Sequence, residues 1–166
     1  MLMFQENEYV MYGLTGVCKL AEKRTETSGD HKGVEYYILY PVKDESAKIM
    51  IPVRLGQGRM RGLITKEELK KHLMQLQEED IWVDDLKERG KDFQERLKTG
   101  EFYQWLAISS CLYGEKKRKV LEGKKLSMVD EKVMKDAWTL LCEEVLYGLE
   151  ITEDQMKRLI NEEEEL

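Results

Sequence analysis

The spacing of apolar residues changes along this chain of 166 residues, from alternation before residue 60 to a helical repeat after Gly62. A period of two places side chains on the two faces of a strand, whereas a period near 3.6 places them along one face of a helix. One segment cannot satisfy both patterns. The change therefore predicts an α+β chain, in which an antiparallel β module (1–60) precedes an all-α helical domain (61–166).

The strand-like segments of the first module are rich in β-branched and aromatic residues and cover residues 8–12, 16–20, 34–40 and 48–53. Turn signals such as Ser28-Gly-Asp30 separate them at short intervals. This spacing is typical of a small barrel or a strongly bent sheet, so we expect a Tudor-like or SH3-like module. The segment Leu55-Gly-Gln-Gly-Arg59 lacks the residues of a phosphate loop, and we expect a flexible turn there.

The helical half contains several helix-capping signals. Thr65 with Glu68 predicts the start of a helix that runs to about Glu79. The next helix is expected to carry Trp82, Leu86, Phe93 and Leu97 near one face and to end at Lys98-Thr-Gly100. Three more are expected: one over 101–121, one capped by Ser127 and a short one opened by Thr152. Trp105 and Trp138 lie among apolar neighbours and are expected in the core.

Residue types that carry chemistry are sparse. The three cysteines, Cys18, Cys111 and Cys142, are far apart and form no metal-ligand spacing, so we expect reduced core or boundary residues. His31 and His72 lie in polar surroundings and are expected at the surface. No nucleophile-base pair or phosphate loop is evident. We therefore expect no enzymatic activity, no metal and no cofactor.

Charge is distributed unevenly along the chain. The formal net charge is −6, but residues 86–125 hold eleven basic and six acidic residues, a balance of +5. This segment contains Lys116-Lys-Arg-Lys119 and Lys124-Lys125. Such a run is either a solvated helix face or a surface for nucleic-acid phosphates. Trp82, which follows Gln77-Glu-Glu-Asp80, is either a packed residue or an exposed apolar wedge.

Several motifs in register resemble the CarD/CdnL family of transcription factors. In the first half they are Tyr12-Gly-Leu-Thr-Gly-Val-Cys-Lys19, Arg24-Thr-Glu-Thr27, Glu35-Tyr-Tyr-Ile-Leu-Tyr-Pro41 and Ile51-Pro-Val53. In the second half they are Trp82, Leu97-Lys-Thr-Gly-Glu101 and Glu122-Gly-Lys-Lys-Leu-Ser127. The resemblance implies a Tudor-like domain, shared with the transcription-repair coupling factor, that binds the RNA polymerase β subunit. It implies no enzymatic reaction.

The resemblance also suggests which residues dock on the polymerase. We expect docking by strand addition, with residues 48–53 as the open sheet edge. Arg24 matches a basic position that assists docking in relatives, and Met50 stands where some relatives have a second arginine. The expected polymerase-binding residues are Arg24, Lys48, Met50, Ile51 and Pro52.

In the helical domain, the resemblance implies that Trp82 acts as a wedge in the minor groove beside the melted promoter bubble. Lys87 matches a basic position, and Lys116, Lys117 and Arg118 are candidates for phosphate contacts. Asp84 and Asp85 replace arginines found in some relatives and would repel phosphates. We therefore expect weak affinity for free promoter DNA, with contact made when the polymerase holds both partners.

These observations favour a cytoplasmic, monomeric regulator that binds the polymerase β subunit and promoter DNA, with no small-molecule substrate. The longest apolar runs fall short of the roughly 18 residues of a membrane span, and no signal-peptide pattern is evident at Met1. An alternative, favoured by Asp84, Asp85 and the acidic run 162–165, is a polymerase-bound adaptor whose helical domain binds another regulator instead of DNA.

Overall fold

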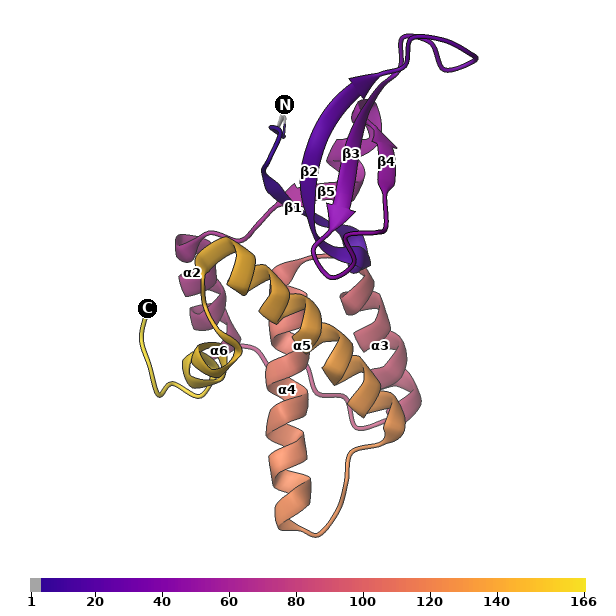
Figure 1. Cartoon of the computed structure of the whole chain (residues 1–166). Helices are drawn as coiled ribbons and strands as arrows, with labels where there is room; N and C mark the ends of the chain where they lie inside the picture. The colour runs from indigo at the N-terminus through magenta and orange to yellow at the C-terminus, as the bar shows by residue number, and fades with distance from the viewer. Residues whose placement is uncertain (1–3) are drawn as a thin grey trace. The chain divides into compact units, whose positions relative to one another are not determined.

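The computed structural model describes residues 4–166 and divides the chain into two compact units, one ending at Leu63 and one running from Ile64 to Leu166. The first unit is built on an antiparallel sheet and the second is helical (Figure 1). The α+β architecture predicted from the change in period is confirmed.

The sheet of the first unit contains five antiparallel strands in the order β4-β3-β2-β1-β5. The strands are β1 (Tyr9–Tyr12), β2 (Gly16–Thr25), β3 (Glu35–Pro41), β4 (Ile49–Pro52) and β5 (Met60–Gly62). A short 3₁₀ turn, η1 (Gly13–Thr15), joins the first two. A register shift between Leu20 and Glu22 interrupts the β2–β3 pairing, and such a bulge bends a strand.

One face of the sheet covers the core of this unit. Its buried residues are Phe4, Val10, Cys18, Leu20, Tyr37, Leu39, Ile51 and Met60. Alternation along β4 is visible in its exposure, because Met50 is exposed while Ile51 is buried. This is the period-two pattern on which the strand prediction depended.

The expectation of a flexible turn around Leu55 is wrong. Residues Val53–Arg59 form helix α1, which leads directly into β5, and β5 pairs with β1. Gly56 lies buried in this helix, and a Cβ atom at this position would be 2.9 Å from Cε2 of the Tyr37 ring. The glycine therefore permits close packing of helix on sheet, a role that local sequence does not reveal.

This packing predicts opposite outcomes for two glycines of α1. Gly56→Ala should lower the free energy of unfolding by about 1–3 kcal/mol, because the buried Tyr37 ring must move. Gly58→Ala, where an added Cβ meets nothing within 4 Å, should be neutral or stabilising by about 0.5–1 kcal/mol. Urea denaturation of both variants measures the difference, and equal effects would contradict the packing role.

The second unit contains five helices. They are α2 (Lys66–Leu76), α3 (Leu86–Lys98), α4 (Phe102–Leu121), α5 (Met128–Leu149) and α6 (Glu153–Ile160). The predicted N-caps are confirmed, since Thr65, Ser127 and Thr152 each accept a hydrogen bond from a backbone N–H three residues later. Gly100 follows α3 with φ of +75°, a conformation that glycine adopts without strain.

Two helix predictions are wrong in detail. Helix α2 ends at Leu76, before the expected Glu79. The next helix begins at Leu86, so Trp82 lies in the preceding loop, and Leu86 is itself exposed. Asp85 caps this helix by accepting a hydrogen bond from the Glu88 backbone N–H, which sets the first helical residue, Leu86, four positions beyond Trp82.

Helices α4 and α5 pack along each other, with α3 against both (Figure 1). Trp105 is fully buried and Trp138 nearly so, as expected for core residues.

His31 is exposed, but His72 is half-buried and stacks against the Phe102 ring, so the surface prediction is wrong for His72. The three cysteines are free, with Cys18 buried and the other two half-buried, as predicted. Burial raises the pKa of Cys111 to about 12.

Candidate polymerase and nucleic-acid interfaces

Trp82 lies in a loop that side chains hold in place at several points. Ile81 is buried, and the Trp82 backbone N–H donates to the Asp80 carboxylate. The indole Nε1–H donates to Oδ1 of Asp84 at 2.9 Å. The Trp82 side chain is half-buried. A loop anchored in this way can hold an aromatic side chain in one orientation without regular secondary structure.

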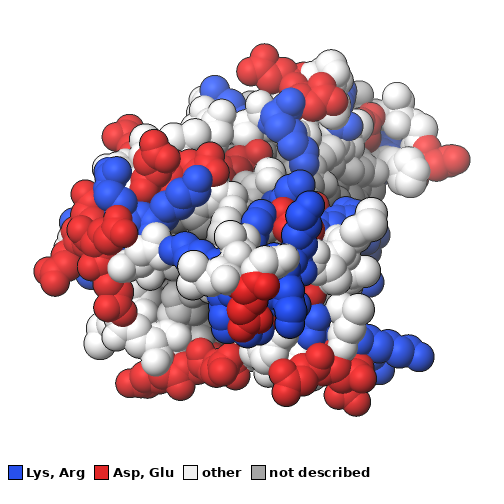
Figure 2. Space-filling model, turned by 90° about the horizontal axis from the view of Figure 1, so that it is seen from below, with Lys and Arg blue, Asp and Glu red and all other residues white. Residues whose placement is uncertain are grey.

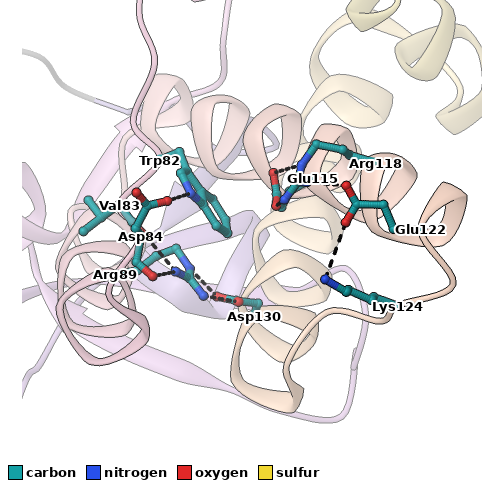
Figure 3. Close-up of polar contacts among 9 residues, drawn as sticks. All are labelled: Trp82, Val83, Asp84, Arg89, Glu115, Arg118, Glu122, Lys124 and Asp130. Carbon is teal, nitrogen blue, oxygen red and sulfur yellow. Dashed lines mark hydrogen bonds and ion pairs between the residues drawn. The ribbon is translucent and has the colours of Figure 1, made fainter.

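The residue beneath Trp82 is Arg89, which is only 4% exposed. Its guanidinium carbon lies 4.1 Å from the centroid of the Trp82 ring, a cation–π arrangement (Figure 3). The same guanidinium donates to the backbone carbonyls of Val83 and Asp84 at 2.6 and 3.1 Å. Arg89 therefore fixes the loop and one side of the indole together.

Arg89 is itself held by a buried carboxylate from α5. It donates two hydrogen bonds to Asp130, Nε to Oδ1 at 3.1 Å and Nη2 to Oδ2 at 2.8 Å, and Asp130 is 2% exposed. These hydrogen bonds raise the pKa of the guanidinium above its ordinary value. A bidentate pair fixes orientation as well as distance. The position of Trp82 thus depends on the packing of α3 against α5.

Arg89 was not among the residues predicted from the sequence, although a signal was present. Arg89, Phe93 and Leu97 recur every four residues and are the buried residues of α3. An arginine on an apolar stripe indicates a buried ion pair, because an unpaired buried charge is strongly unfavourable. The partner could not be found in the same way, since Asp130 lies 41 residues further along the chain.

Asp84 and Asp85, which are expected to repel DNA phosphates, both have structural contacts. Asp84 accepts the indole hydrogen bond of Trp82, and Asp85 caps α3. Both side chains are exposed, so their negative charges remain near this surface. Their contacts explain why carboxylates occupy these positions.

The basic residues of α4 do not point to one surface. Lys116 pairs with Glu131 of α5 at 2.9 Å, whereas Lys117 donates to Asn161, beyond α6, at 3.4 Å. Arg118 instead bonds Glu115 of its own helix and Glu122, the residue that caps the helix C-terminus (Figure 3). Consecutive helical residues are rotated by about 100°, which accounts for this divergence. Lys87 is exposed, and no ion pair is found for it among residues 4–166.

Arg118 and Lys119 of α4 both act on the Glu115 carboxyl, as does Arg89 beneath Trp82. Hydrogen bonds from Arg118 hold the pKa of the Glu115 carboxyl below its ordinary value, and the charge of Arg89 acts in the same direction. Glu122 bonds Arg118 and also lies 3.8 Å from the Lys124 ammonium. Figure 2 shows this interleaving more generally, with Lys and Arg side chains interspersed among acidic ones. Two ion pairs of this segment, Arg89 with Asp130 and Lys116 with Glu131, use carboxylates outside residues 86–125, and they offset part of the +5 balance.

In the first unit, β4 forms an edge of the sheet, as expected for the segment 48–53. The ladder aligns Arg24, Tyr36 and Pro52 across three strands, and Met50 lies on the same face two residues from Pro52. Arg24, Lys48 and Met50 are exposed, while the Ile51 side chain is buried in the core. Arg24 also pairs with Glu22.

An open sheet edge in one unit and a tryptophan fixed on a buried arginine in the other are features of a modular binding protein. Comparison with protein families agrees. Residues 4–64 match the CarD-like/TRCF RID domain, and residues 71–161 match the CarD C-terminal domain.

The chain belongs to the CarD/CdnL family. Families of this kind are regulatory, are associated with transcription and interact with RNA polymerase. A comparison with curated proteins gave no match. No helix among residues 4–166 is both long and apolar enough to cross a membrane.

Proposed function

We propose that this protein binds the RNA polymerase β subunit through the β4 edge and stabilises the open promoter complex through Trp82. The observation that carries the proposal is the support of Trp82 by the buried Arg89–Asp130 pair, which keeps one side of the indole packed while the side chain stays partly exposed. A rigid aromatic group can fill a distorted groove at low entropic cost.

Docking on the β subunit is proposed to add a partner strand to β4. An edge strand presents unpaired backbone groups, and neighbouring side chains select the partner. Met50 and Arg24 share the face beside this edge, so they supply an apolar contact and a charge. The buried Ile51 contributes through its backbone alone.

Met50→Asp tests the docking surface. The substitution places a charge at an exposed apolar position of the edge, and we expect affinity for the β subunit to fall by about tenfold or more. Biolayer interferometry with the full-length protein measures this change. The matched control is Leu14→Asp, because Leu14 and Met50 are both 42% exposed and belong to the same unit. Equal loss in both variants, or none with Met50→Asp, would contradict docking at β4.

The DNA contact is proposed to act by differential binding to two states of the promoter. If Trp82 fits the widened groove of the melted promoter better than closed duplex, it shifts the equilibrium towards the open complex without catalysing a reaction. Lys87 and Lys117 are the proposed phosphate contacts closest in character to free cations, because Lys117 contacts only a neutral amide, that of Asn161. Lys116 and Arg118 contribute less, because Lys116 pairs with Glu131 and Arg118 pairs with Glu115 and Glu122.

The ion pairs on α4 also support the second candidate function, in which the helical unit binds a regulator protein. A surface whose cations are paired with carboxylates attracts DNA weakly. The two functions are distinguished by assembling promoter complexes from polymerase, DNA and this protein alone. Stabilisation that requires a third protein would favour the adaptor.

A further inference from the structure

A small pocket opens on the helical unit between α4, α5 and α6. None of the residues that line it belongs to the loop that contains Trp82. It has a volume of about 200 Å³ and is lined by Tyr113, Lys117, Trp138, Lys157, Ile160 and Asn161. Tyr113 and Trp138 form its aromatic part, with ring centroids 5.4 Å apart and the rings nearly perpendicular. All of these residues belong to one unit, so the pocket does not depend on the other.

The polar groups of this pocket are mainly donors. Lys117 and Lys157 supply ammonium groups, and Tyr113 supplies a hydroxyl that makes no hydrogen bond among the described residues. Burial, followed by the charge of Glu153, raises the pKa of Tyr113, which keeps this hydroxyl protonated. Donors around an apolar space favour a ligand with an apolar group and nearby carboxylates.

The Glu153 carboxylate, one of two that act on Tyr113 together with Glu131, is engaged by two neighbours. It accepts a hydrogen bond from Trp138 Nε1 at 2.7 Å and lies 3.8 Å from the Lys157 ammonium. Lys117 contacts only the neutral Asn161 amide at 3.4 Å among the described residues. Two of the residues that line this pocket are lysines and none is acidic.

Pocket size restricts the class of ligand. Sites for whole small molecules usually exceed about 300 Å³, so the space here suits a single large side chain. Aromatic residues inserted into such pockets are the usual anchors of protein interfaces. The acidic terminus of this chain does not compete for the site, because Glu164, Glu165 and Leu166 lie against a different groove, beside Lys70 and Leu73.

We propose that this pocket binds a partner protein through one aromatic anchor residue flanked by acidic residues. The anchor ring packs against Tyr113 and Trp138, while the flanking carboxylates accept hydrogen bonds from Lys117, Lys157 and the Tyr113 hydroxyl. This site is additional to the β4 edge and to Trp82, and it does not require either of them to function.

The test uses the full-length protein and an acidic five-residue peptide, Asp-Glu-Phe-Glu-Asp with blocked ends. Nitrogen-15 NMR spectra report separately on the indole N–H groups of Trp82, Trp105 and Trp138. We expect the peptide to shift the Trp138 signal and leave that of Trp82 unchanged. Replacing the central phenylalanine with alanine should weaken binding about tenfold or more. An unchanged Trp138 indole N–H signal at millimolar peptide concentration would overturn the proposal. Equal binding of the phenylalanine and alanine peptides would overturn it as well.

A pair of double variants separates specific from general charge effects. Lys117→Gln/Lys157→Gln should weaken peptide binding about tenfold, while Lys132→Gln/Lys135→Gln removes the same charge from exposed positions of α5 and should change it little. Ile160→Trp, whose larger side chain fills the pocket, should block peptide binding although both lysines are retained. Equal losses in both double variants, or unimpaired binding by Ile160→Trp, would overturn the site. Trp82→Ala should bind the peptide normally, so failure of the DNA proposal would be seen independently.

Discussion

Arg89→Met is expected to lower the free energy of unfolding of the helical unit by about 3–5 kcal/mol, because it leaves the carboxylate of Asp130 buried without its partner. The loss has two further components. The carbonyls of Val83 and Asp84 lose a donor, and the Trp82 ring loses the cation beneath it. Urea denaturation followed by circular dichroism at 222 nm measures the change, since the helices dominate that signal.

Arg96→Met is the matched control for this substitution. Arg96 belongs to the same helix and pairs with Asp92 at 2.9 Å, but both side chains are half-exposed. Its replacement should cost about 1 kcal/mol or less. The double variant Arg89→Met/Asp130→Met should recover most of the stability lost in Arg89→Met, because it removes the unpaired charge. Similar costs for Arg89→Met and Arg96→Met would show that the buried pair does not organise this unit.

Trp82→Ala is expected to shorten the lifetime of the open promoter complex by about tenfold or more, since one aromatic contact to a base is worth about 1–3 kcal/mol. Binding to the β subunit should be unchanged, because Trp82 belongs to the helical unit and the proposed docking edge to the other. Dissociation after addition of a competitor such as heparin measures the lifetime. An unchanged lifetime with wild-type docking would remove the wedge role.

Asp84→Asn supplies the control for charge at the same site. The amide oxygen can still accept the indole hydrogen bond, while one negative charge beside the proposed DNA path is lost. We expect the open complex to last as long as with the wild type or longer. A lifetime as short as that of Trp82→Ala would indicate that the loop conformation, and not the indole, is what matters.

The positioning role of Arg89 connects the two predictions. In Arg89→Met the indole remains but its support is lost, so the open-complex lifetime should fall even where the variant stays folded. Arg96→Met should leave the lifetime unchanged. This comparison distinguishes a tryptophan that acts alone from one that depends on its buried support.

Local signals in the sequence were sufficient for most of the secondary structure. The β-branched and aromatic residues of β1 to β4 and the caps at Thr65, Ser127 and Thr152 act over a few residues, so they can be recognised in the chain itself. Errors occurred where a distant contact overrides local preference. Local composition suggested a turn at Gly56, but this residue lies in α1 and packs closely on Tyr37, which is 19 positions earlier in the chain.

For the candidate site, the sequence and the family motifs pointed to Trp82 and to a net basic segment, since residue identity and charge are read directly. The contacts that hold the Trp82 side chain in place were found from the tertiary structure alone. The buried pair between Arg89 and Asp130 joins two helices, and only their packing turns an arginine on an apolar stripe into the support for an indole. The same packing separates Lys116, Lys117 and Arg118, because adjacent residues on a helix meet different neighbours. The amino-acid sequence thus determined which groups are present, and the folded chain decided which of them meet.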